Sequence, residues 1–224
     1  MVHKHYYIPE IISLVQNFAL FRNCSRDEIR QILTDSCWRI RHYKAGEMLL
    51  SAAQSVNSLI VVLSGRVAEY GPGTEEGKTH LVRYLNPGDE YGTALVLCEK
   101  SVELLYLKAD IESDLLFLDL SIISEWVKTY KYPPFIVGMF TSLSDKYRFG
   151  IWKISLLSTH ETCARIMHYF HSLSSSNSAK SILVNCAKLA EEICVNRTSL
   201  YRALSKLEAE GRITRVGSGF RLSE

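Results

Sequence analysis

The stretch that decides the fold lies near the C-terminus, where residues 187–204 read AKLAEEICVNRTSLYRAL. Leu189 and Ile193 are four positions apart, as on the buried face of a short helix. Ala190 is small enough to let a second helix cross closely, and Val195 is placed to fill a turn. The stretch therefore predicts two helices joined by a tight turn.

The second helix of the pair is predicted to begin after Asn196, whose side chain can cap its first turn. Its buried stripe consists of Leu200, Leu204 and Leu207. Its opposite face presents Arg197, Thr198, Ser199, Tyr201 and Arg202. Arginine can bond bidentately to guanine in the DNA major groove, and hydroxyl groups at a helix start can hold a phosphate. This helix is the predicted DNA-contacting element.

Residues 213–222 follow as two predicted short strands around a Gly-Ser-Gly turn. The hairpin offers Arg215 and Arg221 to backbone phosphates, as the wing of a winged helix-turn-helix does. Residues 158–224 contain nine Lys or Arg against six Asp or Glu, a mildly basic balance that favours phosphate contact. A helical pair that binds no nucleic acid is the alternative.

Upstream, a long helix is predicted from Phe135 to Leu157, after the break at Tyr132-Pro133-Pro134. Apolar residues recur along it at alternating steps of four and three, which is the seam of a coiled coil. We therefore predict a homodimer interface, the alternative being a single buried helix within one domain. The seam consists of Ile136, Phe140, Leu143, Tyr147, Gly150, Ile154 and Leu157.

Between Cys37 and Leu120 the sequence changes to short β-rich runs separated by turn residues, among them Ser64-Gly65-Arg66. Many short strands at regular spacing predict a closed barrel or jelly roll. Two capping boxes, Ser25–Glu28 and Ser158–Glu161, are predicted to open helices. The fold class is α+β, with a sensor barrel at 1–130, a dimerisation helix at 131–157 and a winged helix-turn-helix at 158–224.

The bulk composition fits a protein with substantial cores: 224 residues, 47% apolar, with a formal net charge of +2. No apolar run approaches the roughly 20 residues that span a bilayer, and the N-terminus lacks a signal-peptide core, so we expect a cytoplasmic protein without a membrane partner. The six cysteines form no C-x-x-C pair, which favours reduced, mostly buried thiols and no metal or other cofactor, a redox switch being the alternative.

With barrel, seam and winged helix in this order, nearly the whole chain resembles the catabolite activator/FNR (CRP/FNR) family of transcription regulators. The matching segments are SGRV at 64–67, YLNPGD at 84–89 with Gly92 following, and VNRTSLYR at 195–202. The resemblance implies a homodimer that binds double-stranded DNA at a palindromic site, with RNA polymerase as a further partner.

Family members commonly read S-R-E-T-x-x-R in the last motif. Arg197, Ser199 and Arg202 match its Arg, Thr and second Arg, so base and phosphate contact is carried over to them. Thr198 stands where the family often has a Glu that reads cytosine, so the half-site preference should differ there. Cys194 replaces the family's turn glycine, and a positive φ would strain it mildly.

The sensor domain departs further from the family. Cyclic-nucleotide binders hold the phosphate with a G-E-L segment followed by R-S-A. Aligned without gaps, Gly92 is kept, while Thr93, Glu103 and Leu104 replace the Glu, Arg and Ser. Because a carboxylate repels a phosphate, we expect no response to cyclic AMP. A pocket around these four residues for a different effector, or no effector, stays open.

Two other classes of function compete with the regulator. A metal-dependent jelly-roll enzyme would need convergent histidine and carboxylate ligands, but the sole H-x-H is His3-Lys4-His5, near the terminus. A haem-binding branch has four histidines available, without favourable spacing, and the iron–sulfur branch lacks its N-terminal cysteines. A scaffolding module would use the helical pair for protein contacts. No nucleophile triad, P-loop or dinucleotide motif points to an enzyme.

Overall fold

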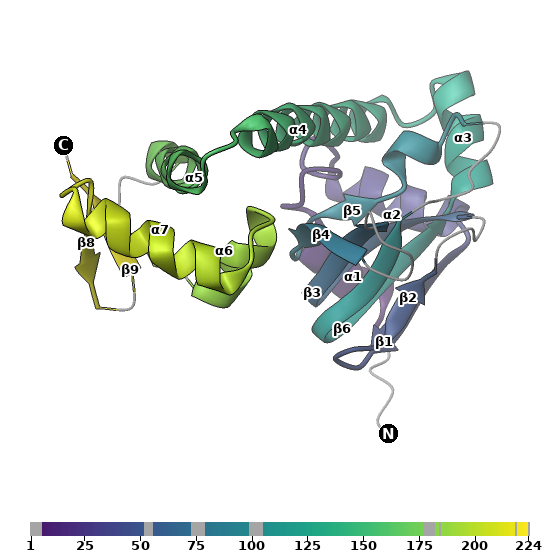
Figure 1. Ribbon diagram of the computed structural model, residues 1–224. Coiled ribbons are helices and arrows are strands. Elements are labelled where there is room, and N and C mark those ends of the chain that lie inside the picture. Colours follow the sequence, from purple (N-terminus) through teal and green to yellow (C-terminus); the bar gives the residue numbers. More distant parts are fainter. Residues whose placement is uncertain are drawn as a thin grey trace. The chain divides into compact units, whose positions relative to one another are not determined.

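The computed structural model describes residues 6–51, 56–72, 79–98, 105–176, 182–183, 185–217 and 219–223. The chain divides into two compact units, Met1–Tyr147 and Arg148–Glu224, with the boundary inside the long helix α4 (Pro133–Ser158) (Figure 1). This helix is the one predicted from Phe135 to Leu157, and its existence is confirmed.

The described strands of the first unit form one antiparallel sheet. Its hydrogen-bonded order is β1-β6-β3-β4, with β2 pairing with β6 and β5 pairing with β3. The two longest strands therefore carry the sheet. The strands are β1 (Trp38–Tyr43), β2 (Met48–Leu50), β3 (Ser58–Pro72), β4 (Thr79–Leu85), β5 (Glu90–Tyr91) and β6 (Tyr106–Asp119).

The prediction of a closed barrel or jelly roll is not met by the described strands, because β1 and β4 end the order and no ladder joins them. Several predicted short strands are instead joined into longer ones. Ser64-Gly65-Arg66, predicted as a separating turn, lies inside β3, where the register with β6 shifts. Gly65 makes this possible: its φ is +86°, and a Cβ there would lie 2.2 Å from the Glu112 carbonyl oxygen.

Helices cover this sheet and share its core. α1 (Ile8–Val15) and α2 (Arg26–Asp35) precede the strands, a 3-10 turn η1 (Thr93–Leu95) follows β5, and α3 (Leu120–Thr129) follows β6. The capping box at the start of α2 is confirmed: the Glu28 amide donates to Ser25 Oγ at 3.2 Å, and the Ser25 amide donates to the Glu28 carboxylate at 2.7 Å.

The first part of α4 packs tightly against the N-terminal helical region. Phe135 and Met139 are buried, and the Phe135 ring lies 5.4 Å from the Phe21 ring. Gly138 is required at this crossing, because a Cβ there would lie 2.1 Å from the Leu20 carbonyl oxygen. The absence of a side chain at Gly138 therefore allows this part of α4 to pack closely within the first unit.

The second unit is helical, with a small antiparallel sheet of order β7-β9-β8. The predicted hairpin is present as β8 and β9, while β7 was not predicted. The capping box at Ser158–Glu161 is wrong, because α4 continues to Ser158 and α5 begins at Thr162. The elements are α5 (Thr162–Ser176), β7 (Ile182–Leu183), α6 (Cys186–Glu192), α7 (Arg197–Ala209), β8 (Ile213–Val216) and β9 (Gly219–Leu222).

The cysteines differ partly from expectation. All six are free thiols, but only Cys163 is fully buried, and Cys37, Cys98 and Cys194 are exposed, so the expectation of mostly buried thiols is wrong. None of the described helices combines the length and the apolar character that crossing a bilayer demands.

Candidate nucleic-acid interface and effector site

The turn between α6 and α7 has the local structure that the sequence predicts. Asn196 caps α7, its side-chain oxygen accepting from the Ser199 amide at 2.8 Å. Cys194 has a φ of 53°, so the positive φ expected at this position is confirmed. The Val195 amide donates to the Ala190 carbonyl oxygen at 2.9 Å, which closes the turn.

A residue outside the predicted set also supports this turn. The Arg165 guanidinium, on α5, donates to the Ile193 carbonyl oxygen at 2.9 Å and to the Thr159 carbonyl oxygen at 2.8 Å. The Ile193 carbonyl lies at the end of α6, where helix geometry leaves carbonyl groups without an intrahelical partner, and Thr159 directly follows the end of α4. No sequence signal marked Arg165, because its partners are backbone atoms.

The leucine stripe of α7 faces the core of the second unit. Leu200, Leu204 and Leu207 are buried there together with Leu189 and Ile193 of the preceding segment. The predicted inner faces of both helices are thereby confirmed. Because the leucines fix the rotation of α7 about its axis, the side chains on the opposite side of the helix are directed outward.

The outward side of α7 is polar and largely exposed to solvent. Arg197, Thr198, Tyr201 and Arg202 are exposed, and Ser199 is half-buried. Within the described part of the chain, the Arg197 and Arg202 guanidinium groups form no hydrogen bond or ion pair. Two arginines at successive turns of a capped helix, free of partners, form a surface that can accept anionic groups.

The hairpin arginines are placed differently. Arg215 pairs with Glu208 at 3.2 Å and lies 5.1 Å from the centre of the Phe220 ring. Hydrogen bonding to Glu208 raises the pKa of Arg215 further above its ordinary value. Arg221 is exposed on β9. A phosphate at the hairpin would therefore compete with Glu208 for Arg215.

The predicted seam of α4 is mostly exposed to solvent. Phe140 is 64% exposed, Tyr147 70% and Ile154 64%. Leu143 and Leu157 are exposed as well, while Ile136 and Gly150 are half-buried. Val137 and Ile151, which were not in the predicted seam, widen this apolar strip. So many apolar side chains in solvent on one helix are typical of an unpartnered interface.

A buried polar cluster joins α4 to β5. Glu90 is 2% exposed, and its carboxylate accepts hydrogen bonds from Lys146 Nζ and from Ser142 Oγ, the latter at 2.5 Å. The Thr93 amide donates to its second oxygen at 3.3 Å. The sequence analysis missed this cluster. Its signal was the spacing of Ser142 and Lys146, which continue the buried helix face of Phe135 and Met139.

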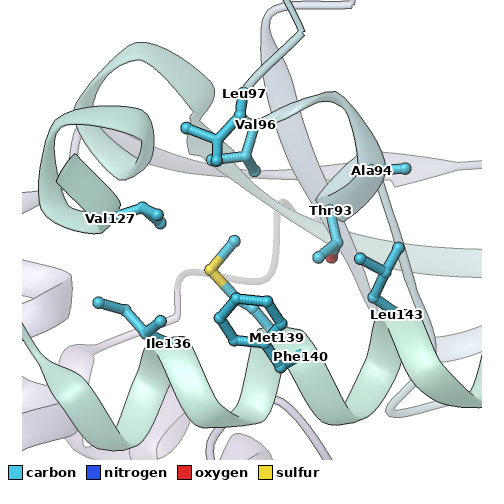
Figure 2. A pocket seen from close by; sticks show the side chains of 9 residues that line it. All are labelled: Thr93, Ala94, Val96, Leu97, Val127, Ile136, Met139, Phe140 and Leu143. Carbon is cyan, nitrogen blue, oxygen red and sulfur yellow. The ribbon is translucent and has the colours of Figure 1, made fainter. Parts of the chain in front are cut away.

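Of the four residues expected around an effector, Gly92 and Thr93 lie at the start of η1, and Glu103 and Leu104 lie outside the described residues. Thr93 lines a cleft of about 150 Å³ within the first unit, and Gly92 does not (Figure 2). The remaining lining is apolar and comes from the segment after Thr93, from α3 and from α4: Ala94, Val96, Leu97, Val127, Ile136, Met139, Phe140 and Leu143.

The described histidines do not form a metal centre. His42 is engaged by Asp114 at 2.9 Å and by Glu112 at 3.3 Å. Burial alone would raise the pKa of Asp114, but hydrogen bonds from Tyr6, His42 and Ser64 hold it below its ordinary value. Among the described residues, no three His, Cys, Asp or Glu side chains are arranged to hold a metal ion.

Comparison with known proteins shows which families and solved structures this chain is similar to. Residues 40–130 match the family model of the cyclic nucleotide-binding domain. A comparison with curated proteins gives no significant match. Among solved structures, the chain is similar to the c-di-GMP responsive global regulator CLP of Xanthomonas campestris, with 19% identity, 89% of this chain and 100% of that chain covered, and a TM-score of 0.69.

The catabolite activator protein of Thermus thermophilus shares 20% identity, covers 92% of this chain and 94% of its own, and gives a TM-score of 0.53. FixK2 of Bradyrhizobium japonicum shares 15% identity, with 84% of this chain and 93% of that chain covered and a TM-score of 0.63. These neighbours are CRP/FNR family regulators. Residues 40–130 are thus similar to cyclic nucleotide-binding domains, and the chain shares the α+β fold of these CRP/FNR regulators.

Proposed function

We propose that this protein is a sequence-specific, DNA-binding transcription regulator of the CRP/FNR type, acting as a homodimer in the cytoplasm. The observation that carries the proposal is the outward face of α7, where Arg197 and Arg202 are exposed without partners in the described part of the chain. In this role α6 and α7 are a helix-turn-helix and β8 and β9 its wing.

The contacts follow from the chemistry of these side chains. Arg197 and Arg202 would reach base edges in the major groove, each bidentate pair with guanine contributing about 1–3 kcal/mol of discrimination. Thr198, Ser199 and Tyr201 would contact phosphates and the neighbouring backbone. Arg221, and Arg215 when released from Glu208, would contact phosphates beside the groove.

Dimerisation would use the exposed strip of α4. A coiled coil between two copies would bury Phe140, Tyr147 and Ile154, which solvent now reaches. The two-fold axis would place two copies of α7 in successive major grooves, which predicts a palindromic site. We assign the sensor to 1–130, the dimerisation helix to 131–157 and the DNA-binding part to 158–224, with RNA polymerase as the partner of the bound dimer.

We propose that cyclic AMP is not the effector. The gapless alignment puts Thr93 and Glu103 where cyclic-nucleotide binders have the Glu that holds the ribose and the Arg that holds the phosphate. A carboxylate in place of that Arg repels the ligand's charge. Calorimetric titration should detect no cyclic AMP binding, and micromolar affinity would contradict this part of the proposal.

The two alternatives are a metal-dependent jelly-roll enzyme and a scaffolding module. Elemental analysis of the purified protein tests the enzyme, which requires a bound transition metal. The dependence of DNA affinity on salt tests the scaffold, because phosphate contacts release counterions and a protein-only module has none to release.

The experiment that tests the function is selection of bound duplexes from a random DNA library by the full-length chain, with and without cell metabolites. The proposal predicts enrichment of an inverted repeat whose half-sites are about one helical turn apart. Recovery of a random population under both conditions would overturn it.

A further inference from the structure

The cleft beside η1 lies entirely within the first unit and opens between three elements. η1 and the residues after it form one wall, Val127 of α3 closes one end, and α4 forms the other wall (Figure 2). Eight of its nine lining side chains are apolar, and none is charged. The nearby charges of Glu90 and Lys146 neutralise each other.

Thr93 is the one polar side chain in this lining. It is 6% exposed, and its hydroxyl has no hydrogen-bond partner among the described residues. Its side chain extends from η1 toward α4, into the cleft (Figure 2). A buried hydroxyl without a partner is unfavourable, and native structures rarely leave one unsatisfied. An occupant of the cleft would supply the missing partner.

We propose that this cleft binds a small, neutral and mainly apolar molecule about the size of one aromatic ring, with one polar group hydrogen-bonded to Thr93 Oγ1. The volume of about 150 Å³ matches this size, since an engineered apolar cavity of about 150 Å³ binds benzene. A charged ligand would lose its hydration without gaining a counter-charge. That this ligand acts as the effector of a regulator rests on the function proposed above, but its binding to the cleft does not depend on that function.

A ligand in the cleft would contact α4 directly. Ile136, Phe140 and Leu143 line the cleft and also belong to the predicted dimer seam. A molecule between η1 and α4 would therefore change the side chains available to a second copy. A side chain of that second copy is the competing occupant, and the experiment separates the two.

The probes are phenol, benzene and benzoate, titrated into the full-length protein labelled with ¹³C at the methionine methyl groups. Met139 lines the cleft. Met48, on β2, and Met167, on α5, lie outside it and serve as internal controls. Phenol should shift the Met139 resonance saturably and leave the controls unchanged. Benzene should bind roughly three- to tenfold more weakly, for lack of the hydrogen bond, and benzoate should not bind.

Two variants sharpen the assignment. Thr93→Val keeps the shape and removes the hydroxyl, so phenol should lose its advantage over benzene while benzene still binds. Val96→Phe, at a lining position that is only 6% exposed, should fill the cleft and abolish both shifts, with unchanged Met48 and Met167 resonances showing that the fold is intact. An unchanged preference for phenol in Thr93→Val would overturn the proposed hydrogen bond and with it the inference.

The outcomes also distinguish this inference from the proposed function. If no probe shifts the Met139 resonance and the protein still selects DNA, the proposed ligand site is overturned and the proposed function is not. A Met139 resonance that changes on dilution but with no probe assigns the cleft to a second copy and equally overturns the inference. Probe binding by a protein without DNA affinity supports the cleft and overturns the regulator.

Discussion

The ammonium group of Lys146, on α4, donates a hydrogen bond to the buried carboxylate of Glu90, on β5. This pair ties the long helix to the sheet 56 residues away in sequence, next to the turn that positions Thr93. Burial alone would raise the pKa of Glu90, but Lys146, Ser142 and the Thr93 amide outweigh it and hold the pKa below its ordinary value. Burial, together with the charge of Arg83, lowers the pKa of Lys146 by more than Glu90 raises it.

Breaking this pair from one side should destabilise the first unit more than removing it altogether. Glu90→Gln leaves the buried ammonium of Lys146 without its counter-charge and should lower the free energy of unfolding by about 3–5 kcal/mol. Lys146→Met leaves the buried carboxylate unpaired and should lower the free energy of unfolding by a similar amount. The double variant should lose less than the sum of the two, measured by urea unfolding. Asp27→Asn, which breaks the exposed pair with Arg30, is the control and should change little. Strictly additive losses would contradict the coupling.

The same carboxylate should contribute to acid sensitivity. Because the folded state lowers the pKa of Glu90, its ionised form adds stability above the ordinary glutamate pKa, and this contribution disappears as the pH falls through the lowered value. Glu90→Gln should therefore lose less stability than the wild type between neutral and acid pH. Urea midpoints at successive pH values measure this. Parallel curves for the two proteins would show that Glu90 is not responsible.

A charge in the α4 seam should separate the two copies. Ile154→Glu would bring two carboxylates together in the interface, so the dimer dissociation constant should rise by at least roughly 100-fold. Ser155→Glu, at the next position, which is also exposed, should leave the dimer unchanged. Sedimentation equilibrium of the 25.5 kDa chain measures both. Equal effects of the two variants would remove the seam from the interface.

The role of α7 is tested at a single guanidinium. Arg202→Ala should abolish preference for the selected duplex, at about 1–3 kcal/mol for each half-site, while the dimer stays intact. Arg212→Ala removes an arginine that lies after the helix and pairs with Glu210 at 3.7 Å, so it should retain the preference. Fluorescence anisotropy with specific and scrambled duplexes distinguishes the variants. Specificity retained in Arg202→Ala would count against this assignment.

The strained turn offers a test of stability. Cys194 holds a φ of 53°, where a side chain is unfavourable, so Cys194→Gly should stabilise the second unit by up to about 1 kcal/mol. Ala190→Gly, in the interior of α6, should instead destabilise it by about 1 kcal/mol, because glycine weakens a helix. Thermal unfolding of both variants measures the difference. A loss of stability in Cys194→Gly would show that this turn is not strained.

Local patterns were sufficient for the α6–α7 pair, because capping, leucine spacing and the turn residue all act within about twenty residues. The cap at Asn196 and the buried Leu200 stripe were predictable for this reason, whereas the positive φ of Cys194 was expected from the resemblance to the CRP/FNR family. The α4 helix was predictable because a heptad pattern persists over its length.

Long-range relationships were not predictable in the same way. Gly65 reads as a turn in the sequence, and only its contact with Glu112 shows that the strand continues through it. The Glu90–Lys146 pair depends on two segments meeting in the fold. The cleft depends equally on the packing of η1 against α4, so the sequence indicated Thr93 without indicating its apolar surroundings.

The central claim is that two copies of α7 contact DNA, and a titration of the selected duplex with the full-length protein at several salt concentrations tests it most directly. We predict two chains per duplex and an affinity that falls steeply with salt, with a logarithmic slope reflecting several neutralised phosphates. One chain per duplex, or an affinity that does not change with salt, would contradict the claim.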